Sequence, residues 1–369
     1  MRPRLAILAA VCLLLAATAA AFDHARPGYR YEFPRDHFSH PAFKTEWWYY
    51  IGNLQTAEGR RFGFELTFFR HAIAEQSGPS QWDIRDLYPA HLTLSDIGGG
   101  RFFKTDRLNR QGPGLAGADA DQARIWNGNW EVQWLDPASD RGPQRLKAYA
   151  DDFSLEFTLT PAKPPVIHGL NGVSQKAAGE GRASHYVSFT RLEVAGSITL
   201  SNNNFPVTGL AWMDHEFSTD SLGPDQTGWD WMSIQLDDES ELMLYRMRRA
   251  DGSADPYSSG TYIDPKGRAQ HLEWTQIRMT PIEGSHWKSP TTGGLYPLKW
   301  QVEIPGLEIR LNCATDLEDQ EVVSRRQMGP SYWEGAMNFK GQKAGRPISG
   351  AGYLEMTGYD KPLTIGPVK

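Results

Sequence analysis

Short runs of alternating hydrophobic and polar residues recur along almost the whole chain, separated by turn residues. Trp47–Leu54 and Phe62–Phe69 flank a Thr-Ala-Glu-Gly turn and predict a β-hairpin. Apolar residues at three- and four-residue spacing rarely persist over about ten positions, so long helices are not expected. Further strands are predicted at 91–94, 130–135, 154–159, 185–194, 208–213, 229–236, 241–247, 260–263, 272–279, 298–304, 307–312, 332–339 and 352–358.

The order of these elements predicts an all-β protein. Strands joined by short turns are typical of β-sandwiches and up-and-down barrels. The alternating strand–helix order of a parallel α/β fold is missing. The run Asn202–Asn204 interrupts the strands and gives the most natural boundary, which predicts domains at 22–205 and 206–369.

One predicted strand carries aromatic and polar side chains on the same face. Within 229–236, Trp229, Trp231, Ser233 and Gln235 alternate with apolar residues and therefore share a face. A simple hydrophobic core would not mix these side chains. Such a face is typical of a barrel wall around an amphipathic or elongated ligand.

The N-terminus has the three parts of a secretory signal. Arg2 and Arg4 give a positive start, an apolar run spans 5–17, and Ala19–Ala21 offers the small residues that signal peptidase needs. We expect residues 1–21 to be a cleaved signal peptide and the protein to be periplasmic. An uncleaved anchor is the alternative, but a spanning helix needs about 20 apolar residues, so we expect no transmembrane segment in the mature chain.

Charge and cysteine content narrow the classes of partner. Two of the 38 basic residues lie in the signal, which leaves 36 against 44 acidic residues and a formal charge of −8. Nucleic-acid binding depends on cationic contacts to phosphate, so it is not expected. Cys313 is the single cysteine after residue 21, so an internal disulfide is excluded. No cofactor is expected.

Four adjacent aromatic residues follow a carboxylate in Lys44–Tyr50. On an extended strand, Trp47 and Tyr49 face one side, whereas Glu46, Trp48 and Tyr50 face the other. Two interpretations remain open. In the first, the rings fill a core and an inter-domain contact while Glu46 pairs with Lys or Arg. In the second, some of the rings line a ligand cavity with Glu46 or Lys44 as a polar group at its end.

A second motif, Gly209–Phe217, places three ionisable residues after an apolar strand. Alternation puts Asp214 and Glu216 on one face with Trp212, and His215 on the other. Because adjacent strand residues diverge, they do not converge on a metal ion, and no metal site is expected. The chain also lacks a Gly-x-Ser-x-Gly nucleophile elbow.

An acid–base role fits Asp214 better. Burial against Trp disfavours the charged carboxylate and raises its pKa. A carboxylic acid that stays protonated near neutral pH can deliver a proton to an unactivated alkene. Trp and Tyr faces would stabilise the resulting carbocation. The alternative is that Asp214 and Glu216 are structural carboxylates held in ion pairs.

These motifs resemble the AttH / hydroxyneurosporene synthase (carotenoid 1,2-hydratase) family. The likeness includes Tyr332–Gly335 and the glycine-bounded strand near the C-terminus. The resemblance runs from about residue 35 to 365 and implies two lipocalin-like antiparallel β-barrels packed together. Phe217 stands where many relatives have Trp, which is a conservative departure. The segments that carry the likeness are 44–50, 209–217, 228–236, 241–246, 332–335 and 352–359.

The resemblance implies two functional branches. One branch hydrates the terminal double bond of acyclic carotenoids, and the other is secreted and associated with ABC-type permeases. Because this chain carries an export signal, our main hypothesis is a protein that binds an elongated lipid or isoprenoid, with an ABC-type permease as the implied partner. The predicted ligand contacts are Glu46, Trp47, Trp48, Tyr50, Trp212, Trp229, Trp231, Tyr245, Tyr332 and Trp333.

The competing hypothesis is a cofactor-free hydratase of an isoprenoid double bond. Asp214 would donate the proton, and His215 or Glu216 would position water. The cationic path would be lined by Trp48, Trp212, Trp229 and Trp231. A third hypothesis is a purely structural partner of a permease, with both barrels filled by side chains.

Overall fold

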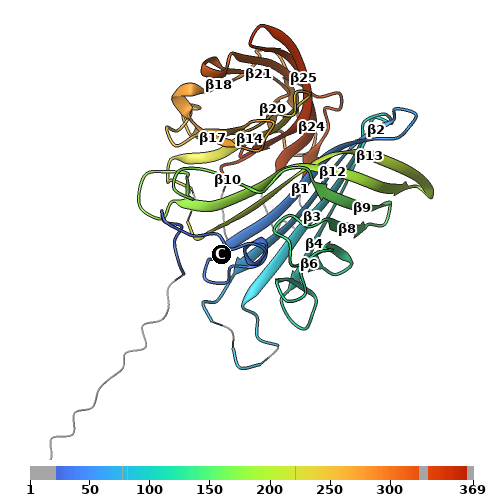
Figure 1. Cartoon of the computed structure of the whole chain (residues 1–369), viewed down its shortest axis with the longest axis vertical. Coiled ribbons are helices and arrows are strands. Elements are labelled where there is room, and N and C mark those ends of the chain that lie inside the picture. The colour runs from blue at the N-terminus through green and yellow to red at the C-terminus, as the bar shows by residue number, and fades with distance from the viewer. Residues whose placement is uncertain (1–21, 77, 81, 221, 324–330, 364–369) are drawn as a thin grey trace, which may run out of the picture.

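The computed structural model describes residues 22–76, 78–80, 82–220, 222–323 and 331–363. Within these ranges, two curled, barrel-like antiparallel sheets hold nearly all the regular structure (Figure 1). The predicted all-β fold of two packed barrels is therefore confirmed. The predicted signal peptide, 1–21, lies outside the described residues. Within the described ranges, the helices are short 3-10 turns, and none has the length and apolar character needed to cross a membrane.

The first sheet runs in the order β4-β3-β2-β1-β13-β12-β9-β8-β7-β6-β5, with β10 and β11 added beside β12. It curls until β4 meets β6 through side chains, where Asn109 Nδ2 donates to Asn127 Oδ1 at 2.6 Å. Its elements are η1 (Arg35–His37), β1 (Thr45–Gln55), β2 (Arg61–Ala72), β3 (Asp86–Asp96), β4 (Arg101–Arg110), β5 (Ala116–Asp119), β6 (Arg124–Asn127), β7 (Trp130–Trp134), β8 (Gln144–Tyr149), β9 (Phe153–Pro161), β10 (Val166–Ile167), β11 (Ser174–Gln175), β12 (Ala183–Leu200) and β13 (Asn203–Ser218).

The second sheet runs in the order β17-β16-β15-β14-β25-β24-β22-β21-β18, with β23 beside β24, and β19 pairs separately with β20. Its elements are β14 (Gln226–Leu236), β15 (Glu241–Arg249), β16 (Ser259–Ile263), β17 (Ala269–Glu273), η2 (Trp274–Gln276), β18 (Arg278–Pro281), β19 (His286–Lys288), β20 (Leu295–Pro297), β21 (Lys299–Ile304), η3 (Pro305–Leu307), β22 (Ile309–Ala314), β23 (Glu321–Val322), β24 (Tyr332–Lys343) and β25 (Arg346–Thr357).

The chain changes sheets later than the predicted boundary at 205. β13 contains that boundary and pairs with both β1 and β12, so the second sheet starts only at β14. The asparagine-rich stretch is the tight turn of a hairpin. Leu200 pairs with Asn203, and Ser201 and Asn202 between them have φ of 50° and 65°. This left-handed backbone suits a two-residue hairpin turn, and Asn tolerates it well.

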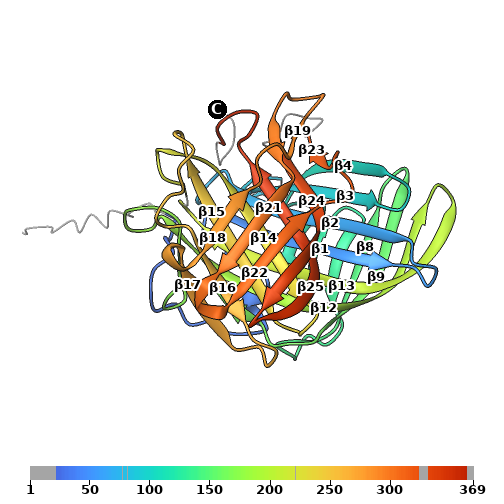
Figure 2. The same ribbon diagram turned by 90° about the horizontal axis from the view of Figure 1, so that it is seen from above.

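Strand alternation divides most of the buried apolar side chains between three layers. Residues such as Trp48 and Tyr50 of β1 enter the first barrel, and Met232 and Ile234 of β14 enter the second. The opposite faces of these strands meet between the sheets, where Tyr49 of β1 lies in a third cluster. Figure 2 shows the second sheet, in yellow to red, lying across the first. We call this third cluster and the polar groups within it the inter-sheet layer.

A buried ion-pair network stabilises one end of the first barrel. Arg70 Nε lies 2.9 Å from Glu46 Oε2, and Arg70 Nη1 lies 3.0 Å from Asp86 Oδ1. His40 Nδ1 and His215 Nε2 lie 2.7 and 2.8 Å from Glu46 Oε1. Burial alone would raise the pKa of Glu46, but Arg70 and the two imidazoles hold it well below its usual range. Glu46 is therefore ionised and structural.

Replacing Arg70 should destabilise the fold strongly. Arg70→Met leaves the Glu46 carboxylate buried without its cation, which costs about 3–5 kcal/mol of unfolding free energy. Urea unfolding measures this loss. Arg145→Met, on the exposed face of β8, is the control and should change stability by less than about 0.5 kcal/mol. A loss below about 1 kcal/mol for Arg70→Met would contradict this role for the network.

Candidate active site

Asp214 lies at the centre of the inter-sheet layer and is almost fully buried. Its Oδ2 accepts a hydrogen bond from the Tyr186 hydroxyl at 2.6 Å. Its Oδ1 accepts from Trp212 Nε1 at 2.5 Å and from the Ser188 hydroxyl. Burial raises the pKa of Asp214 to about 7, although these three donors oppose the rise. Asp214 can therefore hold and release a proton near neutral pH.

The donors to Asp214 are themselves held in place by both sheets. Trp231 Nε1, on β14, donates to the Tyr186 hydroxyl at 3.0 Å. Ser188 Oγ lies 2.8 Å from His168 Nε2, and His168 Nδ1 lies 2.8 Å from Thr261 Oγ1 of β16. Burial lowers the pKa of His168 to about 3, so its ring is neutral. The geometry around Asp214 thus depends on the contact between the sheets.

Glu216 lies on the same face of β13 as Asp214 but in a charged environment. Lys176 Nζ lies 3.3 Å from Glu216 Oε1, and 4.0 and 5.0 Å from the ring centres of Tyr245 and Tyr186. Burial alone would lower the pKa of Lys176, but attraction to Glu216 raises it. The ammonium is therefore charged and lies within cation–π distance of both rings. It comes from the long loop between β9 and β12.

His215 lies on the opposite face of the sheet, inside the first barrel. Its ring stacks on Trp48 with centroids 4.9 Å apart and contacts Glu46. The structure therefore brings Asp214 and Glu216 together in the layer and keeps His215 out of it. A water molecule beside Asp214 would not meet His215. The hypothesis that His215 positions water is not supported by this placement.

The predicted ligand contacts also divide between layers. Most of them line the inter-sheet layer, whereas four point into barrel cores that are filled with side chains. Those in the layer are Trp47, Trp212, Trp229, Trp231, Tyr245 and Tyr332, and those in the barrels are Glu46, Trp48, Tyr50 and Trp333.

A second group of buried acids lies across the layer from Asp214. The Tyr49 hydroxyl donates to Glu334 Oε1 at 2.5 Å, and the Tyr332 hydroxyl donates to Glu65 Oε1 at 2.9 Å. His91 Nδ1 lies 2.6 Å from the Tyr332 oxygen. Burial raises the pKa of Glu65 to about 7 and raises that of Glu334 well above its usual range. Among the described residues, neither carboxyl group has an ion-pair partner.

Several of these residues were missed by the sequence analysis. Tyr49 could have been found, because it pairs with Asp214 across β1 and β13 and both side chains face the same way. Tyr186 and Ser188 alternate on β12 in the same manner. Glu65 and Lys176 gave no local signal, because their positions depend on how the second sheet and a long loop pack onto the first.

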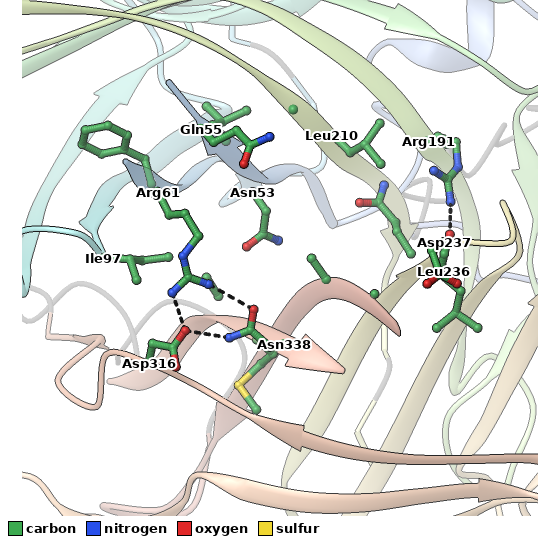
Figure 3. Close-up of a pocket in the computed structure, with 18 of the residues that line it drawn as sticks. Asn53, Gln55, Arg61, Ile97, Arg191, Leu210, Leu236, Asp237, Asp316 and Asn338 are labelled. Carbon is green, nitrogen blue, oxygen red and sulfur yellow. Dashed lines mark hydrogen bonds and ion pairs between the residues drawn. The ribbon is translucent and has the colours of Figure 1, made fainter. Parts of the chain in front are cut away.

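An open pocket of about 470 Å³ lies at one end of the inter-sheet layer (Figure 3). Both sheets contribute to it, through Asn53 of β1 and Gln235 of β14, for example. Arg61 donates to Asn338 Oδ1 at 3.2 Å and pairs with Asp316 at its rim. The pocket therefore offers amide and charged groups at the point where the layer opens to solvent.

One group of side chains in the described residues has the composition of a metal site. Ligand atoms of His40, Glu46 and His215 all lie within 4.8 Å of one another. However, the Arg70 guanidinium already neutralises Glu46, and each imidazole is hydrogen-bonded to that carboxylate. A cation would have to displace these contacts in a fully buried position, so we assign the group a structural role.

Two curated proteins share part of this sequence. The chain is 22% identical over 216 residues to the dehydratase asqC of Emericella nidulans and 23% identical over 216 residues to kievitone hydratase of Fusarium solani subsp. phaseoli. These matches cover 58% and 57% of this chain, and 60% and 59% of the relatives. The chain thus matches less than two thirds of the length of either relative.

Solved structures extend the likeness to nearly the whole chain. A crystal structure described as AttH from Nitrosomonas europaea is 35% identical, with a TM-score of 0.81, and the match covers 92% of this chain and 99% of that one. Kievitone hydratase from Nectria haematococca shares the fold at 15% identity, with a TM-score of 0.69 and coverage of 92% and 96%. The model of the AttH-like family matches residues 24–359. The chain therefore belongs to the AttH-like family.

Proposed function

We propose that this protein is a cofactor-free lyase that adds water to, or removes water from, a carbon–carbon double bond of an apolar molecule. The observation that carries the proposal is Asp214, a buried carboxylic acid with a pKa near 7 that is surrounded by Trp and Tyr rings. The names of two relatives, a dehydratase and a hydratase, support the same chemistry.

In the hydration direction, Asp214 gives its proton to one alkene carbon and becomes a carboxylate. The three donors from Tyr186, Ser188 and Trp212 stabilise this negative charge. Faces of nearby rings such as Trp231 stabilise positive charge on the second carbon. Water adds to that carbon and returns a proton to Asp214, so the acid is regenerated without a cofactor.

The comparisons favour this lyase over the binding protein that was our main hypothesis. Binding of an apolar molecule remains a necessary step of the lyase reaction, and the inter-sheet layer suits it better than the barrels do. The interiors of both barrels are filled by buried side chains in the described residues. The ABC-type permease partner rests on the family resemblance alone, and we do not include it in the proposal.

Replacing Asp214 should abolish turnover without unfolding the protein. Asp214→Asn keeps the shape and the hydrogen-bond acceptor but cannot donate the proton, so the rate of water addition should fall about 10²–10⁴-fold. Mass spectrometry of lycopene and pseudoionone reactions, following the gain of one water, measures this rate. Asp121→Asn, in an exposed turn, is the matched control and should keep full activity. Turnover retained in Asp214→Asn would reject the assigned role.

We also propose that the protein is exported to the periplasm, on the strength of the signal-like sequence in residues 1–21. Expression of the full chain in a Gram-negative host, followed by N-terminal sequencing of the periplasmic fraction, should give a protein that starts at Phe22. An intact Met1 on protein confined to the cytoplasm would contradict export.

A further inference from the structure

Two buried carboxyl groups in the inter-sheet layer each have an oxygen without a hydrogen-bond partner. Glu65 and Glu334 are fully buried, and the Oε2 atom of each forms no hydrogen bond among the described residues. Buried polar atoms are nearly always paired, so unpaired ones call for an explanation. A ligand that carries a complementary polar atom provides one.

These two oxygens belong to one patch where β2 crosses β24. At one contact, Gly63 of β2 packs closely against Tyr353 and Ala336. A Cβ atom added to Gly63 would lie 2.4 Å from the Tyr353 hydroxyl oxygen and 3.1 Å from Ala336 Cβ. At the next, Glu65 binds the Tyr332 hydroxyl at 2.9 Å. Glu334 lies between Tyr332 and Ala336 on the same face of β24. Glu334 and Glu65 therefore face each other across the layer.

The patch adjoins the acid that the proposed reaction uses. Tyr49, which donates to Glu334, is the direct cross-strand partner of Asp214. Such partners have Cβ atoms about 4.5–5.5 Å apart. One molecule in the layer can therefore contact Asp214 from one side and Glu334 from the other.

The open pocket borders this patch. Asn338 and Ala336 line the pocket, and Glu334 is the next residue on the same face of β24. On β1, Asn53 lines the pocket and Tyr49 lies four residues further into the layer. Ala336 therefore lies between the pocket and the Glu334 carboxyl group.

We propose that Glu65 and Glu334 form an oxygen-binding subsite, and that the substrate is an apolar α,β-unsaturated carbonyl compound, or its β-hydroxy hydration product, rather than a hydrocarbon alkene. The inference rests on the proposed function. Burial without an ion-pair partner favours the protonated form of both groups, and a protonated carboxyl group offers an O–H donor to a carbonyl oxygen. A hydrocarbon would leave both donors buried and unpaired, which disfavours its binding.

The subsite also determines which carbon of the double bond receives water and which receives the proton. Hydrogen bonds to the carbonyl oxygen draw electron density from the conjugated double bond toward that oxygen. Water then forms a bond to the β-carbon, and the α-carbon takes its proton from Asp214. The proton lost by water returns to Asp214, so atoms and charges balance, and Glu65 and Glu334 keep their protons throughout.

A matched pair of probes tests the subsite by binding alone. The probes are pseudoionone, an unsaturated ketone, and the hydrocarbon in which a methylene group replaces its carbonyl oxygen. Binding is followed by quenching of Trp fluorescence in the Asp214→Asn protein, which does not turn the ketone over. We expect the ketone to bind at least about 10-fold more tightly than the hydrocarbon, because the hydrocarbon leaves the donors unpaired.

Variants then test whether Glu65 and Glu334 cause the preference for the ketone. Glu334→Leu and Glu65→Leu, each in the Asp214→Asn background, should lose the preference for the ketone, whereas Glu334→Gln, which keeps a donor, should retain part of it. Glu193→Leu, on the exposed part of β12, is the control and should keep it in full. Circular dichroism establishes that each variant is folded.

Three results would overturn the subsite: equal affinity for the two probes, no binding of the ketone by folded protein, or a preference that survives in both leucine variants. These results differ from a failure of the proposed function. If Asp214→Asn and the unaltered chain turn over equally well, or neither adds water to any probe, the lyase fails even though the ketone preference is present.

Discussion

Asp214, Glu65 and Glu334 are buried between the two sheets with no ion-pair partner among the described residues, and this constraint governs the chemistry of the molecule. An ionised carboxylate that leaves water for such a place loses several kcal/mol of solvation. The group instead keeps its proton, which is why the pKa of Asp214 and that of Glu65 both rise to about 7. The packing of the sheets thus produces acids that keep their protons up to about pH 7, where an ordinary Asp or Glu is ionised.

In the first barrel, a carboxylate on one of the same strands is paired with a cation and stays ionised. Glu46 lies three residues before Tyr49, and His215 follows Asp214 directly, yet both enter the barrel core. There Arg70 supplies the missing cation, so Glu46 stays ionised and serves the fold. Strand alternation therefore separates a charged structural network from a neutral acid site, although the two are adjacent in sequence.

Much of this arrangement could be predicted from the sequence, because strand alternation is local. It placed Trp212, Asp214 and Glu216 on one face and His215 on the other, as the structure has them. It also split the aromatic run Lys44–Tyr50 correctly between two layers. The local pattern predicts which residues share a face of the sheet, but not which of the two faces contacts the ligand.

The remaining parts of the site depend on contacts between segments that are distant in the sequence. The sequence gives no measure of how β2 crosses β24, so the approach of Glu65 to Glu334 was not predictable. Lys176 and His168 reach the layer from a loop that resembles a simple connection in the sequence. The sequence predicts a domain boundary at Asn202–Asn204, whereas the structure has a tight hairpin turn at Ser201 and Asn202, because such a turn and a linker share the same residue types.

The most direct test is an infrared titration of the protonated carboxyl band, in which the spectrum of Asp214→Asn is subtracted from that of the unaltered protein between about pH 5 and about pH 9. Because burial raises the pKa of Asp214, its protonated form should persist well above the usual range for Asp and disappear as the pH rises through about 7. An Asp214 carboxyl that is already ionised at about pH 5 would contradict the account.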